Sequence, residues 1–411
     1  MGYRGESRVI RAMAALALMS MLAAPGSSGC ARPKAPENSG RLRLALAIFP
    51  GEAVKYRAFL KDFENDAHVK VDLIAQSYAD ILGVLLAEGS AGSGSLDLAE
   101  LDLSMLARAR GSVRTLDTLV SPEAEALFPR AAWKAARFDG KLFFIPHRLM
   151  WQAMIYNRLE VPNPPATWNA LLEFARRHPG KVVLKGARYE GATCDALSFL
   201  WSAGGNPLAP ESPANLRAFE FLAQLAPYLN PESPVYREMS VLEAQARGSV
   251  WIHFNWPFAI GYLQSKGLSP SVDLSAPIPS GPDGTATVLG GGYLAIPRSA
   301  PHPRLAAAFI RYLLTRDAQA RLSGELGWYG SLGPPAGSGQ AKLYAGFVAM
   351  RPYVRARPAI DCYAQLSNAW QRGFRAVLFH HAQPAEALAK VASMGRFEKS
   401  SAAAGRPCTC P

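Results

Sequence analysis

Residues 42–63 read LRLALAIFPGEAVKYRAFLKDF, and this stretch contains the pattern that decides the fold. Its first part, 42–49, is a largely apolar run of strand length. Four apolar residues in the second part have the spacing i, i+3, i+4 and i+7 and form one stripe of a helix: Tyr56, Phe59, Leu60 and Phe63. A strand followed by an amphipathic helix is the first step of an alternating α/β fold.

The alternation continues along the chain. A second strand is predicted at 69–75, a helix at 78–87 and, after the Gly/Ser loop 89–95, a third strand that begins at Leu96. Strands that alternate with helices indicate a parallel sheet with helices on both faces. Ligands of such sheets bind beyond the carboxyl ends of the strands. We therefore expect the loops after the three strands to form one rim that presents Glu52, Tyr78 and Asp102.

The middle of the chain predicts a further set of strands and helices. Thr167 is a good N-cap for the helix that follows it. The expected strands are 142–146, 151–156, 250–256 and 293–296, and the expected helices are 168–178, 214–225, 239–246 and 305–323. The sequence contains no internal repeat, heptad pattern or low-complexity block.

The N-terminus has the features of an export signal. Arg4, Arg8 and Arg11 provide a positive region, and 12–24 is an apolar region without charges. No later stretch approaches the ~20 apolar residues that are needed to cross a bilayer. We therefore predict an exported protein with a soluble mature body, located in the periplasm or at the cell surface.

A lipid anchor is predicted at Cys30. Small residues lead up to this cysteine in an arrangement that resembles a bacterial lipobox, although Ser27 stands where a Leu is usual. We predict a signal peptide at 1–29 and, at 30–40, the lipidated cysteine and a tether rich in Pro, Ser and Lys. The alternative is a secretory signal that is cut elsewhere.

The distribution of charge argues against a nucleic-acid-binding protein. The chain of 411 residues has a net charge of +12, and removal of 1–29, which contains three Arg and one Glu, leaves +10. The basic residues are scattered, without a block of five like charges or a basic-aromatic module. With 49% hydrophobic and 18% charged residues, we expect a globular chain with a solvated basic surface.

Four cysteines remain once Cys30 is assigned to lipid: Cys194, Cys362, Cys408 and Cys410. An even number in an oxidising compartment favours disulfides, although the sequence does not determine their pairing. We favour a bond between Cys194 and Cys362. The Cys-x-Cys at the end could close a small loop, bind metal or lie in a frayed tail, and we expect 396–411 to be disordered.

Four stretches carry a resemblance to a known family. They are 140–146 (GKLFFIP), 155–158 (IYNR) followed by 164–168 (PPATW), 247–250 (RGSV) with Trp256 soon after, and 289–296 (LGGGYLAI) followed by a helix that contains Gln319. In this order, and with a spread over roughly 42–390, they resemble the maltose-type extracellular solute-binding proteins of bacterial ABC importers. Ser249 departs from the family pattern, which has a Lys at this position.

The resemblance implies an α/β, two-lobed periplasmic-binding-protein fold of type II, in which discontinuous lobes are joined by a hinge. We expect lobe one at 41–145 plus 287–335 and lobe two at 146–286 plus 336–395. The implied function is the substrate-binding component of an ABC importer, which holds a sugar or oligosaccharide between the lobes by hinge closure. The implied partners are this small ligand and the ABC permease subunits, and we expect a monomer without a cofactor.

Sugar recognition needs aromatic faces for the C–H patches of the ring and polar side chains for its hydroxyls. Trp256 could instead be core, Arg148 could form a structural ion pair, and Tyr293 could belong to a turn after the glycines. The ligand-binding candidates are Glu52, Tyr78, Asp102, Arg148, Trp151, Asn255, Trp256, Gly291, Tyr293, Trp328, Tyr329 and Asp361.

Catalytic signatures do not occur in this sequence. It lacks H-E-x-x-H, a P-loop and a convincing nucleophile elbow, and His380–His381 lacks the spacing of metal ligands. We therefore predict a binding protein without metal, and not an enzyme. The alternatives are a binder of an anionic or phosphorylated molecule, a sensory ligand-binder, and an exported glycoside-active enzyme that would use two rim carboxylates.

Overall fold

The computed structural model describes residues 40–89, 94–267, 273–335 and 337–395. The predictions of a signal peptide at 1–29, of lipidation at Cys30 and of a disordered tail at 396–411 lie outside the described residues, as does nearly all of the tether at 30–40. Within them, no helix combines the length and the apolar character needed to cross a membrane.

The first sheet contains the three predicted strands: β1 (Arg41–Leu46), β2 (Lys70–Ala75) and β3 (Leu98–Asp102). These strands are parallel, in the order β2-β1-β3. The sheet as a whole is mixed, because β11 (Thr287–Ala295) pairs antiparallel with both β3 and β6 (Ile145–Trp151). β12 (Val354–Arg355) completes it beside β11.

Helix α1 (Pro50–Ala67) packs on this sheet through the predicted stripe: Tyr56, Phe59, Leu60 and Phe63 are its buried residues. Four apolar and aromatic residues at helical spacing are enough to specify this face. The other helices on this side of the molecule are α2 (Tyr78–Glu88), α3 (Leu106–Ala109), α4 (Pro122–Ala126), α5 (Arg130–Ala136), α11 (Pro303–Leu313) and α12 (Arg316–Leu326), with the hairpin of β4 (Arg137–Phe138) and β5 (Lys141–Leu142).

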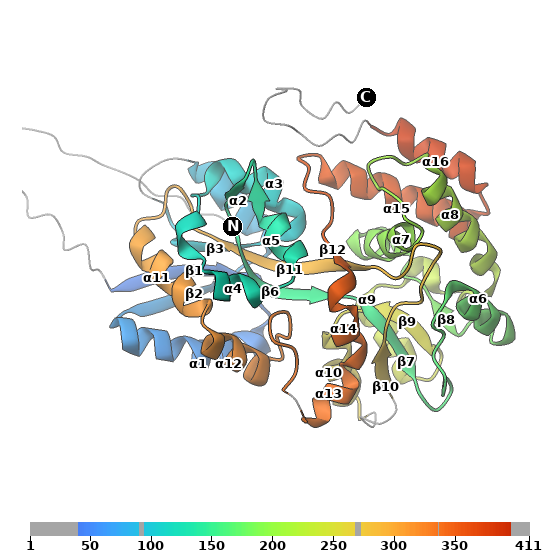
Figure 1. Ribbon diagram of the computed structural model, residues 1–411, viewed down its shortest axis with the longest axis horizontal. Helices are drawn as coiled ribbons and strands as arrows, with labels where there is room; N and C mark the ends of the chain where they lie inside the picture. The colour runs from blue at the N-terminus through green and yellow to red at the C-terminus, as the bar shows by residue number, and fades with distance from the viewer. Residues whose placement is uncertain (1–39, 90–93, 268–272, 336, 396–411) are drawn as a thin grey trace, which may run out of the picture. The chain divides into compact units, whose positions relative to one another are not determined.

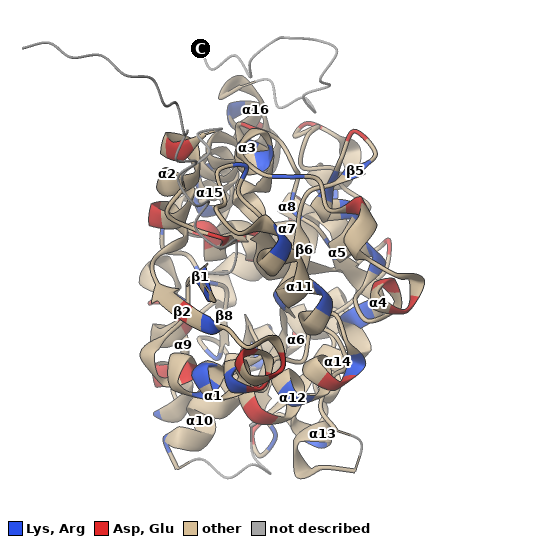
Figure 2. Cartoon of the chain, turned by 90° about the vertical axis from the view of Figure 1, so that its left-hand side faces the viewer, with Lys and Arg blue, Asp and Glu red and all other residues tan. Residues whose placement is uncertain are grey.

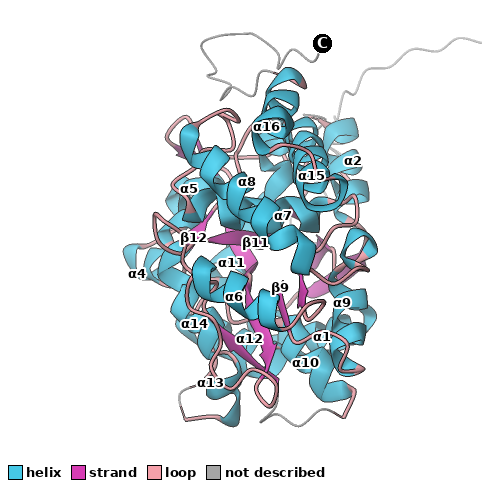
Figure 3. Cartoon of the chain, turned by 90° about the vertical axis from the view of Figure 1, so that its right-hand side faces the viewer, coloured by secondary structure: helices cyan, strands magenta, loops and turns pink. Residues whose placement is uncertain are grey.

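The second sheet has the order β10-β7-β9-β8. Its strands are β7 (Ala153–Asn157), β8 (Val182–Val183), β9 (Ile252–Asn255) and β10 (Asp273–Ala276). The helices around it are α6 (Trp168–Arg177), α7 (Glu190–Ser202), α8 (Pro213–Leu225), α9 (Glu238–Ala246), α10 (Phe258–Ser265), α13 (Gly339–Leu343), α14 (Ala345–Met350), α15 (Tyr363–His380) and α16 (Pro384–Ser393). In Figure 3, α6, α7, α8 and α15 cover the strands on the side that faces the viewer.

The predicted cap of α6 is confirmed. The Thr167 side chain accepts a hydrogen bond from the Ala170 amide at 3.2 Å. The predicted helix 305–323 is wrong in its continuity, because the chain forms α11 and α12 instead. The break lies before Thr315, whose hydroxyl accepts a hydrogen bond from the Ala318 amide and so begins a new helix.

Strands form two of the segments that carry the chain between the sheets. One passes from β6 through Gln152 into β7, and the other is β11, which pairs with β12 at its start and with β3 at its end. The glycines 290–292 lie inside β11, so the strand is longer than predicted and contains no turn there. Gly291 has φ +110°, and a Cβ at this residue would collide with the carbonyl oxygen of Arg148.

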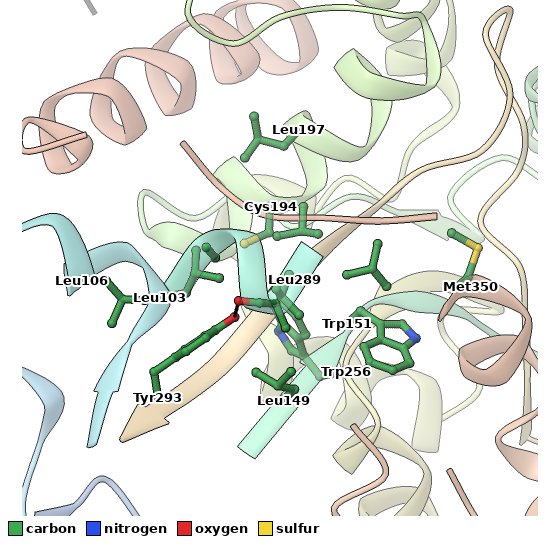
Figure 4. Packing of buried hydrophobic residues seen from close by; sticks show 14 of the residues in the cluster. Leu103, Leu106, Leu149, Trp151, Cys194, Leu197, Trp256, Leu289, Tyr293 and Met350 are labelled. Carbon is green, nitrogen blue, oxygen red and sulfur yellow. Dashed lines mark hydrogen bonds between the residues drawn. The ribbon is translucent and has the colours of Figure 1, made fainter. Parts of the chain in front are cut away.

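A continuous apolar core extends from one sheet to the other. Figure 4 shows Leu106 and Tyr293 at one side of it, Leu289 and Trp256 beside β11, and Trp151 at the other side. The two sheets are thus joined by buried side chains as well as by backbone.

The predicted disulfide between Cys194 and Cys362 is wrong. Cys194 is a free thiol on α7, and its side chain points into the core. Burial raises the pKa of this thiol well above its ordinary value. Cys362, next to the start of α15, is disulfide-bonded, but not to Cys194.

Candidate ligand-binding site

Arg148 on β6 is the centre of a polar cluster at the carboxyl ends of the parallel strands. Its Nε and Nη2 donate hydrogen bonds to the two carboxylate oxygens of Glu100 at 3.0 and 2.7 Å. Glu100 is fully buried, and His147 also contacts it, with 2.7 Å between Nδ1 and Oε1. Burial alone would raise the pKa of Glu100, but Arg148 and His147 outweigh it and lower this pKa to about 2.

Three further predicted residues surround Arg148. Glu52 lies 3.6 Å from the guanidinium, and Tyr78 accepts a hydrogen bond from it at 3.3 Å. The Trp328 ring lies 5.2 Å from the guanidinium carbon, and its Nε1 donates to Glu52 at 3.3 Å. We call this group, which comes from α1, α2, β6 and the end of α12, the first rim: Glu52, Tyr78, Arg148 and Trp328.

A second cluster surrounds Glu190 at the start of α7, and sequence reasoning missed all of it. Glu190 accepts hydrogen bonds from the Arg357 guanidinium at 2.9 Å, from the Ser367 hydroxyl at 2.6 Å and from the Tyr363 hydroxyl. These residues come from α7, α15 and the segment between β12 and α15. We call Glu190, Arg357, Tyr363 and Ser367 the second rim.

Arg357 joins the second rim to Asp102 at the end of β3. Its Nη2 lies 2.9 and 3.1 Å from the two carboxylate oxygens of Asp102, and its side chain is buried. Burial would lower the pKa of Arg357, but Asp102, Tyr363 and Glu190 keep it above its ordinary value. A weaker contact also joins the two sides, because Asp361 lies 3.6 Å from Arg110. One buried arginine therefore links a carboxylate at the end of β3 in the first sheet to one on α7, a helix beside the second sheet.

Four other predicted residues are buried. Asn255 and Tyr293 are fully buried, with hydrogen bonds to the carbonyl oxygens of Glu238 and Ala132 at 3.3 Å each. They offer no surface to a ligand in this structure. Trp151 and Trp256 donate to Phe347 and Glu238 at 2.6 and 3.4 Å. Of the last two candidates, Gly291 lies against the backbone of Arg148, which leaves no room for a side chain there, and Tyr329 lines a cavity described below.

Two exposed aromatic residues were missed as well, one of them beside the first rim. Phe49, 76% exposed, directly precedes α1, and its amide donates to Glu52 at 3.4 Å. Phe258, 42% exposed, begins α10 two residues after Trp256. Both follow the end of a strand and adjoin a proline, which is the signal in the sequence that could have identified them.

The surface charges show no single-sign region on the face that Figure 2 displays. Basic and acidic segments are interspersed, for example over α1 and α12. This distribution agrees with a solvated surface and not with a nucleic-acid-binding face.

Comparisons with known proteins give the family and the fold. The family model for bacterial extracellular solute-binding proteins matches residues 58–348. A probable ABC transporter-binding protein of Deinococcus radiodurans is 28% identical over 230 residues, which are 50% of this chain and 54% of that protein. The chain thus spans about half the length of this curated relative.

Solved structures match over nearly their whole length. The cyclic alpha-maltosyl-1,6-maltose binding protein of Arthrobacter globiformis has a TM-score of 0.74 at 20% identity, with coverage of 85% of this chain and 96% of that chain. A solute-binding protein of Thermotoga lettingae, bound with alpha-D-tagatose, has a TM-score of 0.70 at 22% identity, with coverage of 86% and 98%. The predicted fold class, maltose-binding-like and α/β, is confirmed by these matches.

Proposed function

This chain belongs to the bacterial extracellular solute-binding proteins, and from this membership we propose that it binds a neutral sugar or oligosaccharide between the two rims and delivers it to an ABC importer. The observation that carries the proposal is the pairing of both rim arginines with carboxylates. Sugar-binding relatives such as the tagatose-bound protein support a carbohydrate ligand.

The balance of charge favours a neutral ligand over an anionic one. Arg148 is paired with Glu100 and Glu52, and Arg357 with Asp102 and Glu190. An anionic ligand would need a cation that is not already neutralised, and neither rim arginine meets this condition. The rims instead present carboxylates that are partly exposed, which suits hydroxyl donors of a sugar.

Aromatic surface on both sides suits the apolar faces of a sugar ring. Phe49 and Trp328 lie by the first rim, and Phe258 follows β9 of the second sheet. We propose that these rings stack on the ligand, with Glu52, Asp102 and Glu190 bonded to its hydroxyls. Closure about the crossing segments β6–β7 and β11 would bring both sides onto the ligand.

The family is extracellular, so the chain is exported. We propose that Cys30 carries a lipid anchor, that the protein is a monomer and that the lobe boundaries are those predicted above. We also propose that it catalyses no reaction. A glycosidase pair needs one carboxyl group free to donate a proton, and Arg357 engages both Asp102 and Glu190.

A thermal-shift screen of the full chain tests the proposal. The ligands are neutral di- and oligosaccharides, polyols, acidic sugars and glycerophosphodiesters. A ligand present at ~100 times its Kd raises stability by about 2.7 kcal/mol. We expect neutral sugars to raise the melting temperature of the parent protein but not that of Phe258→Ala or Glu190→Gln. Leu159→Ala, a matched change at another exposed apolar residue, should retain the rise. A shift with anionic compounds alone would refute the neutral ligand, and product formation would indicate an enzyme.

A further inference from the structure

A cavity of about 120 Å³ lies beside β6, where the chain passes between the sheets. None of its lining residues belongs to the first or second rim. Its walls include Trp151, Tyr329, Tyr344 and Phe347. The rings of Tyr329 and Tyr344 meet edge to face at 4.6 Å, and the Trp151 indole N–H is already bonded to the Phe347 carbonyl oxygen. The lining is therefore mostly carbon, with little for a polar ligand to bind.

The size of the cavity suits a single aromatic ring. An apolar cavity of ~150 Å³ holds benzene in another protein and otherwise stays dry. Val348, which lines the cavity, is half exposed, so one wall reaches the solvent. A small molecule can thus enter without unfolding of the core.

One cation stands at the edge of this cavity. Arg351 donates from Nη1 to the Ser331 carbonyl oxygen at 2.5 Å and from Nη2 to that of Leu127 at 2.9 Å. Among the described residues, no carboxylate lies within ion-pair distance of it. Burial lowers the pKa of Arg351. A guanidinium has five N–H donors, so this one keeps donors beyond the two carbonyl contacts.

This arginine differs from those of the two rims. Arg148 and Arg357 each have two carboxylate partners, whereas Arg351 has neutral acceptors only. A half-buried cation without an anion is stabilised by any carboxylate that reaches it, since such hydrogen bonds are charge-assisted and often bidentate.

We propose that this cavity is a second ligand site that binds a small aromatic monocarboxylate, with the ring against Trp151, Tyr344 and Phe347 and the carboxylate on Arg351. The ligand class differs from the sugar proposed for the rims in both charge and polarity. The inference does not depend on that function.

Titration of the full chain with benzoate, followed by calorimetry and by saturation-transfer NMR, tests the site. We expect benzoate to bind, and Arg351→Met to weaken it about tenfold or more, the usual scale for loss of a charge-assisted pair. Arg355→Met is the matched control, because Arg355 is exposed and does not line the cavity. It should leave the affinity unchanged. Benzyl alcohol, which has the ring without the charge, should bind far more weakly and should not respond to Arg351→Met.

Val348→Trp provides a second, independent variant. Its side chain is half exposed, so the fold should tolerate the change, while the indole would fill the cavity and abolish benzoate binding. Melting temperatures of all variants show whether each is folded. If Arg351→Met does not fold, the effect of Val348→Trp on benzoate binding tests the proposal instead. Absence of benzoate binding, equal binding of benzyl alcohol, or binding that survives in folded forms of both variants would overturn the proposal.

Discussion

Arg148 and Arg357 are both held by carboxylates, yet they serve different parts of the molecule. The partners of Arg148, Glu100 on β3 and Glu52 on α1, lie on the same sheet and its helix. Those of Arg357, Asp102 and Glu190, lie on opposite sides of the crossing strands. The first cluster therefore stabilises one side of the molecule, whereas the second holds the two sides together. The contacts of Arg357 with Asp102 and Glu190 cannot both persist if the two sides move apart.

The largest effect is expected from Glu100→Gln. The change leaves the Arg148 guanidinium buried without its main anion, which costs about 3–5 kcal/mol of the free energy of unfolding. Urea denaturation measures this loss. Glu173→Gln, at an exposed pair on α6, is the matched control and should leave the midpoint unchanged. If Glu100→Gln lowers the free energy of unfolding no more than this control does, the first cluster does not stabilise the fold.

The same pair predicts a dependence of stability on pH. The pKa of Glu100 falls from the ordinary 4.5 to about 2 in the folded protein. Its contribution is therefore fully present above pH 4.5 and is lost as the pH falls toward 2, a total of about 3 kcal/mol. Urea titrations between pH 2 and 6 should show this loss in the parent protein and in Arg357→Met. An equal slope in Glu100→Gln would contradict the assignment.

Arg357→Met should have a smaller effect on stability and a larger one on shape in solution. Asp102 and Glu190 are 20% and 37% exposed, so water can replace part of the hydrogen bonding that they lose with Arg357. We expect the free energy of unfolding to fall by about 1–3 kcal/mol. Small-angle X-ray scattering should report a larger radius of gyration than for Glu100→Gln. Equal radii would mean that Arg357 does not restrain the two sides.

The smallest effect is expected from Asp361→Asn. Its partner Arg110 lies across the same boundary at 3.6 Å, but the Asp361 side chain is 45% exposed. An ion pair of this kind contributes less than about 1 kcal/mol, and salt screens it. The measured loss should vanish at high salt, whereas that of Arg357→Met should persist. A loss as large as that of Arg357→Met would remove the distinction between the buried and the exposed contact.

Part of the first rim could be placed from the sequence, because local rules position Glu52 and Tyr78. Glu52 and Tyr78 follow parallel strands, and the carboxyl ends of such strands share one edge of a sheet. The stripe of α1 and the cap at Thr167 follow from spacing and side-chain chemistry over a few residues. These parts of the structure depend on short stretches of sequence.

The second rim could not be predicted because its contacts join distant segments. Arg357 and Glu190 are 167 residues apart, and no spacing rule connects them. The disulfide failed for a similar reason, since a count of cysteines gives no partners. Cys194 is a residue of the core, and its sequence neighbours on α7 are almost all buried. The break before Thr315 was missed because one capping residue outweighed a helical pattern on both sides of it.

The position of β11 has a consequence for the order in which the molecule can assemble. This strand lies between β3 and β12 in the first sheet, yet it follows every strand of the second sheet in the chain. One edge of β3 lacks its neighbour until β11 begins at Thr287, 185 residues after β3 ends at Asp102, and this is slow, long-range pairing. The strands of the second sheet are all present by Ala276. The sheet that begins the chain is therefore the sheet that is completed last, and the open edge of β3 is the part of it most exposed to aggregation in the meantime.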